Sequence, residues 1–436
     1  MFPVLIRRVR FSLVCGSVSN RMINVQLLWK GQLTLIAALA AGCLMSGPAA
    51  RAAQEGSTVP EPQVQSQAAG ACPNESGLDN ALGQASALLQ QSRFQDAAEL
   101  LQPLADKHCD ARVSLLLAAG YEGEKDIPKA ASVLNQAHSV WPSNDSIAAS
   151  LAREYLSAGE PDKALKALAQ FHVTAKTPEQ EIEMAVVVYL AAHRLLSAQK
   201  LAEEDNKLYP SLHSQLLVAN TLQMQGRYPD VIRLLAGKRA LYANSPDFFI
   251  TLAESEFDAS TYVAARQDLQ RAIALNPKLY QAHYLLGNVL AKINAADGAI
   301  AEYRLAIDLA PEQPRTYYQL ALVLRSKQDD AGEQRALEQA LAADSRYGPA
   351  HCELGRILLE DHRPADALNH LLAAVQYNPR SEKAYFLLAR AYAAMGEKDK
   401  SRQTVKLLEA VRKENQPGSS NTNEGISTAG QSTSRR

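Results

Sequence analysis

The sequence predicts an all-α protein built by stacking copies of one helical hairpin. Two observations concern composition: alanine and leucine dominate the 436 residues, of which only 6% are aromatic, and no window alternates apolar and polar residues as a half-buried strand does. The third is an internal period of 33 or 34 residues, which is typical of repeat proteins. We therefore expect one continuous stack of hairpins rather than the two or three globular domains that this length would ordinarily suggest.

The period is visible when two segments are aligned. Residues 280–313 read YQAHYLLGNVLAKINAADGAIAEYRLAIDLAPEQ, and residues 348–381 read GPAHCELGRILLEDHRPADALNHLLAAVQYNPRS, without a gap between them. They share the pattern of the tetratricopeptide repeat (TPR), a 34-residue helix–turn–helix with the signature W-x2-L-G-x2-Y, then A-x3-F, then P. The chain fills these slots with His283, Leu286, Gly287, Leu290, Ala299, Tyr303 and Pro311, and again with His351, Leu354, Gly355, Leu358, Ala367, Leu371 and Pro379.

This resemblance implies a right-handed α-solenoid of about ten repeats over residues 78–413, with first helices lining a concave groove. A small side chain lets the second helix approach the first, and a proline ends the second helix. Glu333 occupies a small-residue slot and Gly237-Lys238 fall late in the fifth hairpin, so these two hairpins depart from the pattern. The expected repeats start at Leu78, Ala111, Asp145, Glu179, Leu212, Pro246, Tyr280, Pro314, Gly348 and Glu382.

The two ends of the chain differ from the repeats. Residues 1–52 hold six basic residues and no acidic one, and the apolar run 33–45 precedes small residues, as in a secretory signal peptide whose true start would be Met22. That run is about 13 residues, short of the roughly 20 that span a bilayer, which disfavours an uncleaved anchor. Residues 53–77 are expected to form a flexible linker, and residues 414–436 a disordered tail.

Two signals for processing compete in the leader. LAAGC, ending at Cys43, resembles the lipobox of bacterial lipoproteins, but Ala40 stands where that motif prefers Leu, Val or Ile. Ala50-Arg51-Ala52 is a small-x-small cleavage site that fits the end of the apolar run better. We expect cleavage after Ala52 and keep lipidation of Cys43 as the alternative; either way the chain would be exported, to the periplasm or to the outer membrane of a bacterium.

Cysteine positions suggest one disulfide in the exported chain. Cys72 precedes the first predicted helix, and Cys109 follows the second helix of the same hairpin. Antiparallel helices bring these ends together, so a Cys72–Cys109 bond would close a loop of about 38 residues and add roughly 3 to 4 kcal/mol on the chain-entropy model. Two unpaired thiols are the alternative.

Charge and motifs exclude several classes of function. Without residues 1–52 the chain has 39 Lys and Arg (45 less six) against 46 Asp and Glu, a net charge of −7, which argues against nucleic-acid binding. No nucleophile elbow, phosphate-binding glycine loop or Cys-x-x-Cys is present, so we expect no enzyme and no cofactor. His351, His362 and His370 have spacings that suit no zinc motif, and we expect no metal.

The resemblance also implies where a ligand would lie. In the TPR family the second, fifth, ninth and twelfth residues of each repeat tend to face the groove, which here gives a polar middle and a basic C-terminal third. We therefore expect a protein-interaction scaffold that binds an extended, acidic peptide segment. A substrate-recruiting partner of a separate enzyme, or a lipoprotein of an outer-membrane assembly or secretion machine, is the alternative. The groove candidates are Asn220, Glu254, Tyr284, Asn288, Tyr318, Arg325, Arg356 and Arg390, with Gln223, Arg315 and Lys383 beside them.

Overall fold

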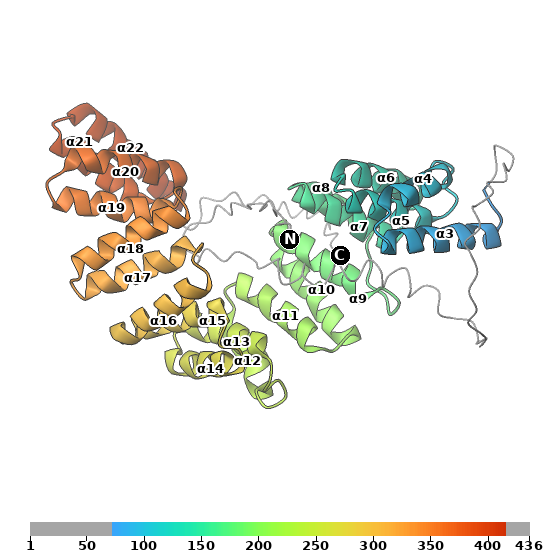
Figure 1. The fold of residues 1–436 in the computed structure, drawn as a ribbon, viewed down its shortest axis with the longest axis horizontal. Coiled ribbons are helices and arrows are strands. Elements are labelled where there is room, and N and C mark those ends of the chain that lie inside the picture. The colour runs from blue at the N-terminus through green and yellow to red at the C-terminus, as the bar shows by residue number, and fades with distance from the viewer. Residues whose placement is uncertain (1–71, 416–436) are drawn as a thin grey trace, which may run out of the picture. The chain divides into compact units, whose positions relative to one another are not determined.

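The computed structural model describes residues 72–415, which form helices and turns with no strand in that range. This part of the chain falls into two compact units, called unit 1 (residues 72–227) and unit 2 (residues 228–415). Figure 1 shows each unit as a succession of antiparallel helices. The predicted signal peptide, Cys43, the cleavage site, most of the linker and nearly all of the tail lie outside the described residues.

Unit 1 contains nine helices, and each contacts the next along the chain. Their bounds are α3 (Glu75–Gln90), α4 (Phe94–Ala105), α5 (Ala111–Gly123), α6 (Ile127–Val140), α7 (Asp145–Ser157), α8 (Pro161–Ala167), α9 (Glu179–Ala191), α10 (Leu195–Leu208) and α11 (Leu212–Met224).

Unit 2 begins inside the fifth predicted hairpin and continues the same pattern through five further hairpins. Its elements are α12 (Tyr228–Leu235), a 3-10 turn (Ala236–Lys238), α13 (Pro246–Asp258), α14 (Tyr262–Leu275), α15 (Tyr280–Lys292), α16 (Ala296–Leu309), α17 (Pro314–Ser326), α18 (Asp330–Ala343), α19 (Gly348–Glu360), α20 (Pro364–Tyr377), α21 (Glu382–Ala394) and α22 (Lys398–Asn415).

The helix starts follow the repeat predicted from the sequence. From Ala111 to Glu382, nine first helices begin at the expected residue. The exception is α3, which starts at Glu75 instead of Leu78 because the side chain of Asn74 accepts the backbone N–H of Gly77 and caps the helix there. The expected linker is therefore three residues too long, and α22 continues two residues into the expected tail.

Close approach of the two helices in a hairpin explains the small-residue slots. Ala97, Ala130, Ala265 and Ala367 on second helices are fully buried. Across the hairpin of α15 and α16, a Cβ added to Gly287 would lie 2.6 Å from the ring of Tyr303, so only glycine fits there. The small residues of the repeat signature thus mark where the backbones of the two helices lie close together.

Each hairpin turns through one residue with positive φ. In the hairpin of α15 and α16 this residue is Asn294, at φ 60°, and the N–H of Ala295 then donates to the C=O of Leu290. This is the Schellman geometry that ends helices and satisfies a terminal carbonyl. His362, one of the three histidines considered as metal ligands, has the same position between α19 and α20.

Two second helices are shorter than the repeat predicts. The α12 helix ends at Leu235 and passes into the 3-10 turn at Gly237 and Lys238, as the departure in the sequence suggested. The α8 helix spans only Pro161–Ala167, which the sequence analysis did not foresee. After it, the Thr177 hydroxyl accepts the N–H of Thr174 in an irregular segment.

The first helices line the inner side of each unit. Within unit 1, α5 contacts α7 and α7 contacts α9; within unit 2, α13 contacts α15, α15 contacts α17 and α19 contacts α21. Among the described residues, second helices make no contacts with one another of comparable extent. First helices therefore lie closer together than second helices, which gives each unit a concave inner face.

A disulfide ties down the start of unit 1. Cys72 and Cys109 are bonded, with their Cα atoms 5.5 Å apart, across the hairpin of α3 and α4. The third cysteine of the described chain, Cys352, is a buried free thiol on α19. No helix in residues 72–415 combines the length and the apolar character needed to cross a membrane.

Candidate functional site

The inner face of unit 2 carries most of the predicted groove residues. Asn220 lies on α11 in unit 1, whereas the other seven lie on first helices of unit 2. They occupy two clusters and a few separate positions. The residues are Glu254 on α13, Tyr284 and Asn288 on α15, Tyr318 and Arg325 on α17, Arg356 on α19 and Arg390 on α21.

The first cluster contains one arginine and four tyrosines; we call Arg315, Tyr280, Tyr284, Tyr318 and Tyr347 the Arg315–tyrosine cluster. The Arg315 Nε donates to the Tyr280 hydroxyl at 3.0 Å. Its guanidinium carbon lies 4.5 Å from the ring centroid of Tyr284 and 5.6 Å from that of Tyr280, within the range of a cation–π contact. All five side chains are half-buried.

The tyrosines of this cluster also support one another. Tyr280 and Tyr284 stack with ring centroids 6.0 Å apart, and Tyr318 meets the edge of Tyr347 at 5.9 Å. Burial raises the pKa of Tyr318 to about 12 and also raises the pKa of Tyr347, so both hydroxyls stay protonated and can donate. The cluster thus presents neutral donors and one cation.

Arg315 has no carboxylate partner in the part of the chain that the structure describes. Burial disfavours its charge, but the nearby Tyr280 and Tyr284 raise the pKa of the guanidinium, which stays protonated. Within residues 72–415, no Asp or Glu forms an ion pair with it. A half-buried cation that lacks a counter-charge is poised to meet an anionic group from a ligand.

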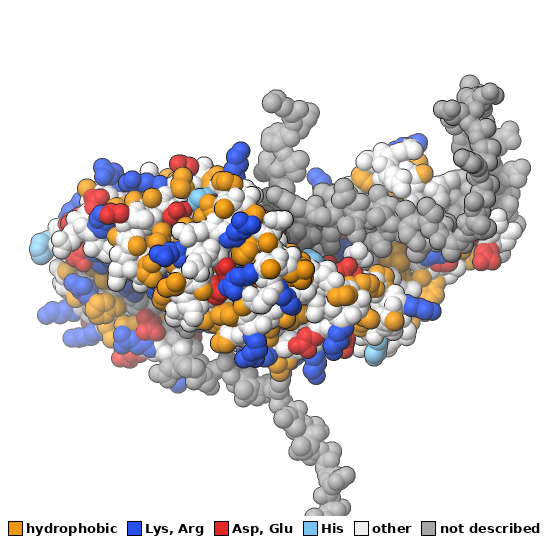
Figure 2. Space-filling model, turned by 90° about the horizontal axis from the view of Figure 1, so that it is seen from below, with side chains coloured by type: hydrophobic (Ala, Val, Ile, Leu, Met, Phe, Trp, Pro, Cys, Tyr) orange, Lys and Arg blue, Asp and Glu red, His pale blue; other side chains and the backbone are white. Residues whose placement is uncertain are grey.

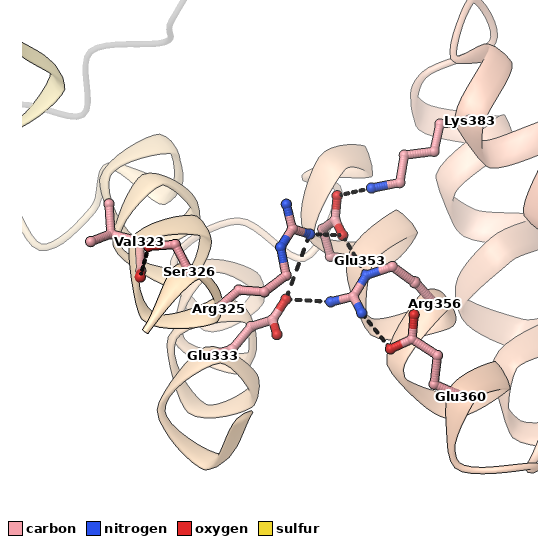
Figure 3. A network of polar contacts seen from close by, with 8 residues as sticks. All are labelled: Val323, Arg325, Ser326, Glu333, Glu353, Arg356, Glu360 and Lys383. Carbon is pink, nitrogen blue, oxygen red and sulfur yellow. Dashed lines mark hydrogen bonds and ion pairs between the residues drawn. The ribbon is translucent and has the colours of Figure 1, made fainter. Parts of the chain in front are cut away.

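The second cluster contains three basic and three acidic side chains; we call Arg325, Arg356, Lys383, Glu333, Glu353 and Glu360 the Glu353 ionic cluster. Figure 3 shows Glu353 between the three cations and Arg356 between three carboxylates. The Arg325 Nη1 and Arg356 Nε each lie 2.9 Å from Glu353 Oε2. Arg356 also binds Glu333 and Glu360, and Lys383 binds Glu353.

Two carboxylates of the Glu353 ionic cluster are buried and need counter-charges. Glu333 and Glu353 are each 2% exposed. Burial alone would raise the pKa of Glu353, but hydrogen bonds from Lys383 and Arg356 hold it below the usual value. Burial raises the pKa of Glu333 despite the opposing effect of Arg356. The cations are therefore needed to keep two buried carboxylates charged.

This pairing changes the interpretation of two predicted groove residues. Arg356, whose side chain is only 15% exposed, is occupied by the protein's own carboxylates. Arg325 also pairs with Glu353, although 40% of its side chain stays exposed. Both were predicted to meet a ligand from their positions in the repeat, whereas Glu333 was interpreted only as a departure from the packing pattern. That glutamate in a small-residue slot was the signal for the ionic cluster.

Three other predicted residues have local contacts. Asn288 Oδ1 accepts the Tyr303 hydroxyl at 2.8 Å, and Glu254 accepts from the Gln281 side chain at 2.8 Å. Arg390 is exposed and lies 5.9 Å from the ring of Phe386, which is itself 49% exposed. On the face drawn in Figure 2, basic and acidic side chains are interspersed.

A histidine pair lies between α19 and α20. The Nδ1 atoms of His351 and His370 are 3.0 Å apart, and burial followed by the charge of His351 lowers the pKa of His370. The sequence spacing hid this pair because the two residues lie on different helices of one hairpin. No further ligand residue joins them into a metal-binding group within the described residues.

Comparison with known proteins gives the following matches. Models of the tetratricopeptide repeat match residues 82–145 and 250–314, and residues 358–417. No curated protein matches the sequence. Among solved structures, the APC/C hetero-tetramer Cut9–Hcn1 is 17% identical, with 72% of this chain and 64% of that chain covered and a TM-score of 0.44.

Two smaller solved structures are also similar. MamA from Desulfovibrio magneticus RS-1 is 19% identical, with 38% of this chain and 93% of that chain covered and a TM-score of 0.35. YrrB, described as a TPR protein with an unusual peptide-binding site, is 17% identical, with 41% and 92% covered and a TM-score of 0.34.

Proposed function

Because the chain is a tetratricopeptide-repeat protein, we propose that it is a non-catalytic scaffold that binds an extended segment of a partner protein on the inner face of unit 2. Such repeats are generally interaction modules, and their stacked first helices supply a long binding surface. The observation that carries the proposal is Arg315, a half-buried cation that contacts Tyr280 and Tyr284 and that no carboxylate of residues 72–415 neutralises.

The chemistry of this cluster favours an acidic ligand group. A carboxylate, at a chain end or on an Asp or Glu side chain, would accept charge-assisted hydrogen bonds from Arg315. The hydroxyls of Tyr318 and Tyr347 are protonated donors in the same cluster. Tyrosine rings add apolar contact area at low entropic cost, as they do at many protein interfaces. We therefore still propose an acidic ligand, as expected from the sequence, but we assign its binding to Arg315 in place of Arg356.

Site-specific photocrosslinking tests the proposal because it captures a partner whose identity is still open. Tyr318 would be replaced by a photoreactive phenylalanine analogue in the full chain, expressed where the protein normally occurs. We expect a discrete crosslinked partner that is lost when Arg315→Gln is added. The matched control places the same analogue at Leu305 on α16, a second-helix residue that is 46% exposed. Equal crosslinking from both positions, or from Tyr318 with and without Arg315, would contradict the proposal.

We also propose that the scaffold works outside the cytoplasm. The support is the Cys72–Cys109 bond, because disulfides persist in oxidising compartments and are rare in the cytosol. After cleavage at Ala52 the mature chain would retain three cysteines, of which only Cys352 would be a thiol. Counting thiols in the denatured, unreduced protein should give one. Three thiols would contradict the proposal, and radiolabelled lipid incorporation lost in Cys43→Ser would indicate lipidation in place of cleavage.

A further inference from the structure

Three carboxylates meet in unit 1 at the junction of α9, α10 and α11. Glu179 and Glu183 are four residues apart and share one face of α9, and Asp205 lies in the last turn of α10. Oxygen atoms of these three side chains all lie within 4.8 Å of one another. His213, in the first turn of α11, places Nε2 2.8 Å from Glu183 Oε1. We call these four residues the α9–α11 acidic cluster.

Asp205 is the unusual member of this cluster. Its side chain is fully buried, and neither carboxylate oxygen has a hydrogen-bond partner. Buried carboxylates in native proteins are normally paired or bind a metal, because an isolated buried charge is costly. Asp205 also lies near the C-terminus of α10, where the helix dipole disfavours a negative charge. This orphaned side chain, aimed into a group of carboxylates, is evidence for a missing positive charge.

No basic side chain of the described chain fills that role. Lys and Arg form no ion pair with Glu179, Glu183 or Asp205 within residues 72–415, and His213 is the one cationic group that acts on them. Burial, then Glu183 and Glu179, raise the pKa of Asp205 to about 7, against the opposing effect of His213. The hydrogen bond from His213 to Glu183 raises the pKa of the imidazole. His213 contacts Glu183, and both oxygens of the Asp205 side chain are left without a hydrogen-bond partner among the described residues.

We propose that Glu179, Glu183 and Asp205 bind one divalent transition-metal ion, such as Mn²⁺ or Zn²⁺, with the His213 imidazole as an adjoining nitrogen donor. Carboxylate oxygens suit Mn²⁺, and a mixed oxygen and nitrogen set is also common for Zn²⁺, whereas Ca²⁺ and Mg²⁺ take oxygen ligands alone. The ion has a route to the cluster because Glu179 and Glu183 are half-buried and 51% of the His213 side chain is exposed. Such a site would fasten α11 to the hairpin of α9 and α10.

The test uses the full mature chain, stripped with EDTA and then titrated with MnCl₂ or ZnCl₂ by calorimetry. We expect saturable binding of one ion, with loss of the free Mn²⁺ signal in electron paramagnetic resonance. At a concentration of 100 times Kd the melting temperature should rise by roughly 4 °C. Ca²⁺ at the same concentration should give a much smaller shift.

Asp205→Asn is the decisive variant because it keeps the shape of the side chain and removes its charge. We expect metal affinity to fall at least tenfold, while the metal-free melting temperature stays equal or rises because an unpaired buried charge is gone. The matched control is Glu204→Gln, the neighbouring residue on α10, which is exposed and carries the same charge. Its metal affinity should match that of the wild type.

Two results would overturn the proposal. One is the absence of saturable binding of Mn²⁺ and Zn²⁺ to the wild type, which would leave a proton as the occupant of Asp205. The other is binding that Asp205→Asn leaves unchanged. If Asp205→Asn lost its helical circular dichroism, Glu183→Gln, at a half-buried position, would replace it with the same expected loss of affinity.

Discussion

The two charged clusters on the inner face of unit 2 differ in how their charge is balanced. In the Glu353 ionic cluster three cations meet three carboxylates, and two of those carboxylates are almost completely buried. In the Arg315–tyrosine cluster one cation meets only hydroxyls and aromatic rings among the described residues. Arg315, Arg325 and Arg356 all lie on first helices, so their position in the repeat does not distinguish the two clusters.

This difference separates charges that hold the fold from charges that are available to a ligand. Removing one member of a balanced buried cluster leaves the others uncompensated, which is strongly destabilising. Removing Arg315 leaves no buried carboxylate without its counter-charge, because Arg315 pairs with none among the described residues. The fold should therefore tolerate the change. Substitutions in the two clusters should therefore have opposite effects on stability and on binding.

The largest expected effect is on stability, from Glu353→Gln. This change leaves Arg325, Arg356 and Lys383 around a neutral side chain, and we expect a loss of about 3 kcal/mol in the free energy of unfolding. Denaturant titration followed by far-ultraviolet circular dichroism measures it. Glu360→Gln is the control, because its side chain is 57% exposed and should cost about 0.5 kcal/mol. Equal losses would show that burial does not set the importance of this cluster.

The next effect is on binding, from Arg315→Gln. A charge-assisted hydrogen bond contributes about 1.5 to 3 kcal/mol. Its loss should lower the affinity for the partner segment identified by crosslinking by roughly 10- to 100-fold. Fluorescence polarisation with that segment as a labelled peptide measures the change. The free energy of unfolding should change by less than about 1 kcal/mol. A variant that binds normally, or that unfolds as readily as Glu353→Gln, would remove the distinction between the clusters.

Salt should affect the two clusters unequally. Screening is substantial at an ionic strength of about 0.1 M for accessible charges and much weaker for buried ones. We expect a several-fold loss of peptide affinity between about 0.05 and 0.5 M NaCl, whereas the stability difference between wild type and Glu353→Gln should stay nearly constant. Affinity that is independent of salt would indicate that apolar contacts with the tyrosines dominate binding.

The smallest effect concerns the histidine pair of α19 and α20, where the surroundings of His370 disfavour its protonated, charged form. The folded-state pKa of His370 is lowered, by burial and by His351, so its contribution to stability is lost as pH falls through about 6.5 toward the folded value. His370→Gln should therefore lose less stability than the wild type between pH 7.5 and 5.5, by under about 1 kcal/mol. Parallel curves for the two proteins would show that His370 does not contribute to the acid sensitivity.

The repeat architecture could be predicted from the sequence because it depends on local rules. Small residues such as Ala299 and Gly287 mark close helix approach, and prolines such as Pro311 follow the ends of second helices by two residues. The short α8 helix could not be predicted because the repeat period is unchanged across its hairpin. An irregular segment after α8 replaces a turn of helix there.

The pairing of side chains could be predicted only in part. Arg315 and Tyr318 follow from their positions in the repeat, but the cluster also needs Tyr347, which precedes α19 and lies outside those positions. The ion pair of Arg356 with Glu333 joins adjacent hairpins, 23 residues apart. Such contacts depend on rotamers and on the spacing of neighbouring helices, which no periodicity records.

A double-mutant cycle measures whether Arg315 binds a carboxylate of the partner. The four dissociation constants are those of wild type and Arg315→Gln for the crosslinked segment and for the same peptide with its carboxylates replaced by amides. We expect a coupling energy of about 1.5 kcal/mol or more, so that the amide peptide binds both proteins with similar affinity. A coupling energy near zero would contradict it.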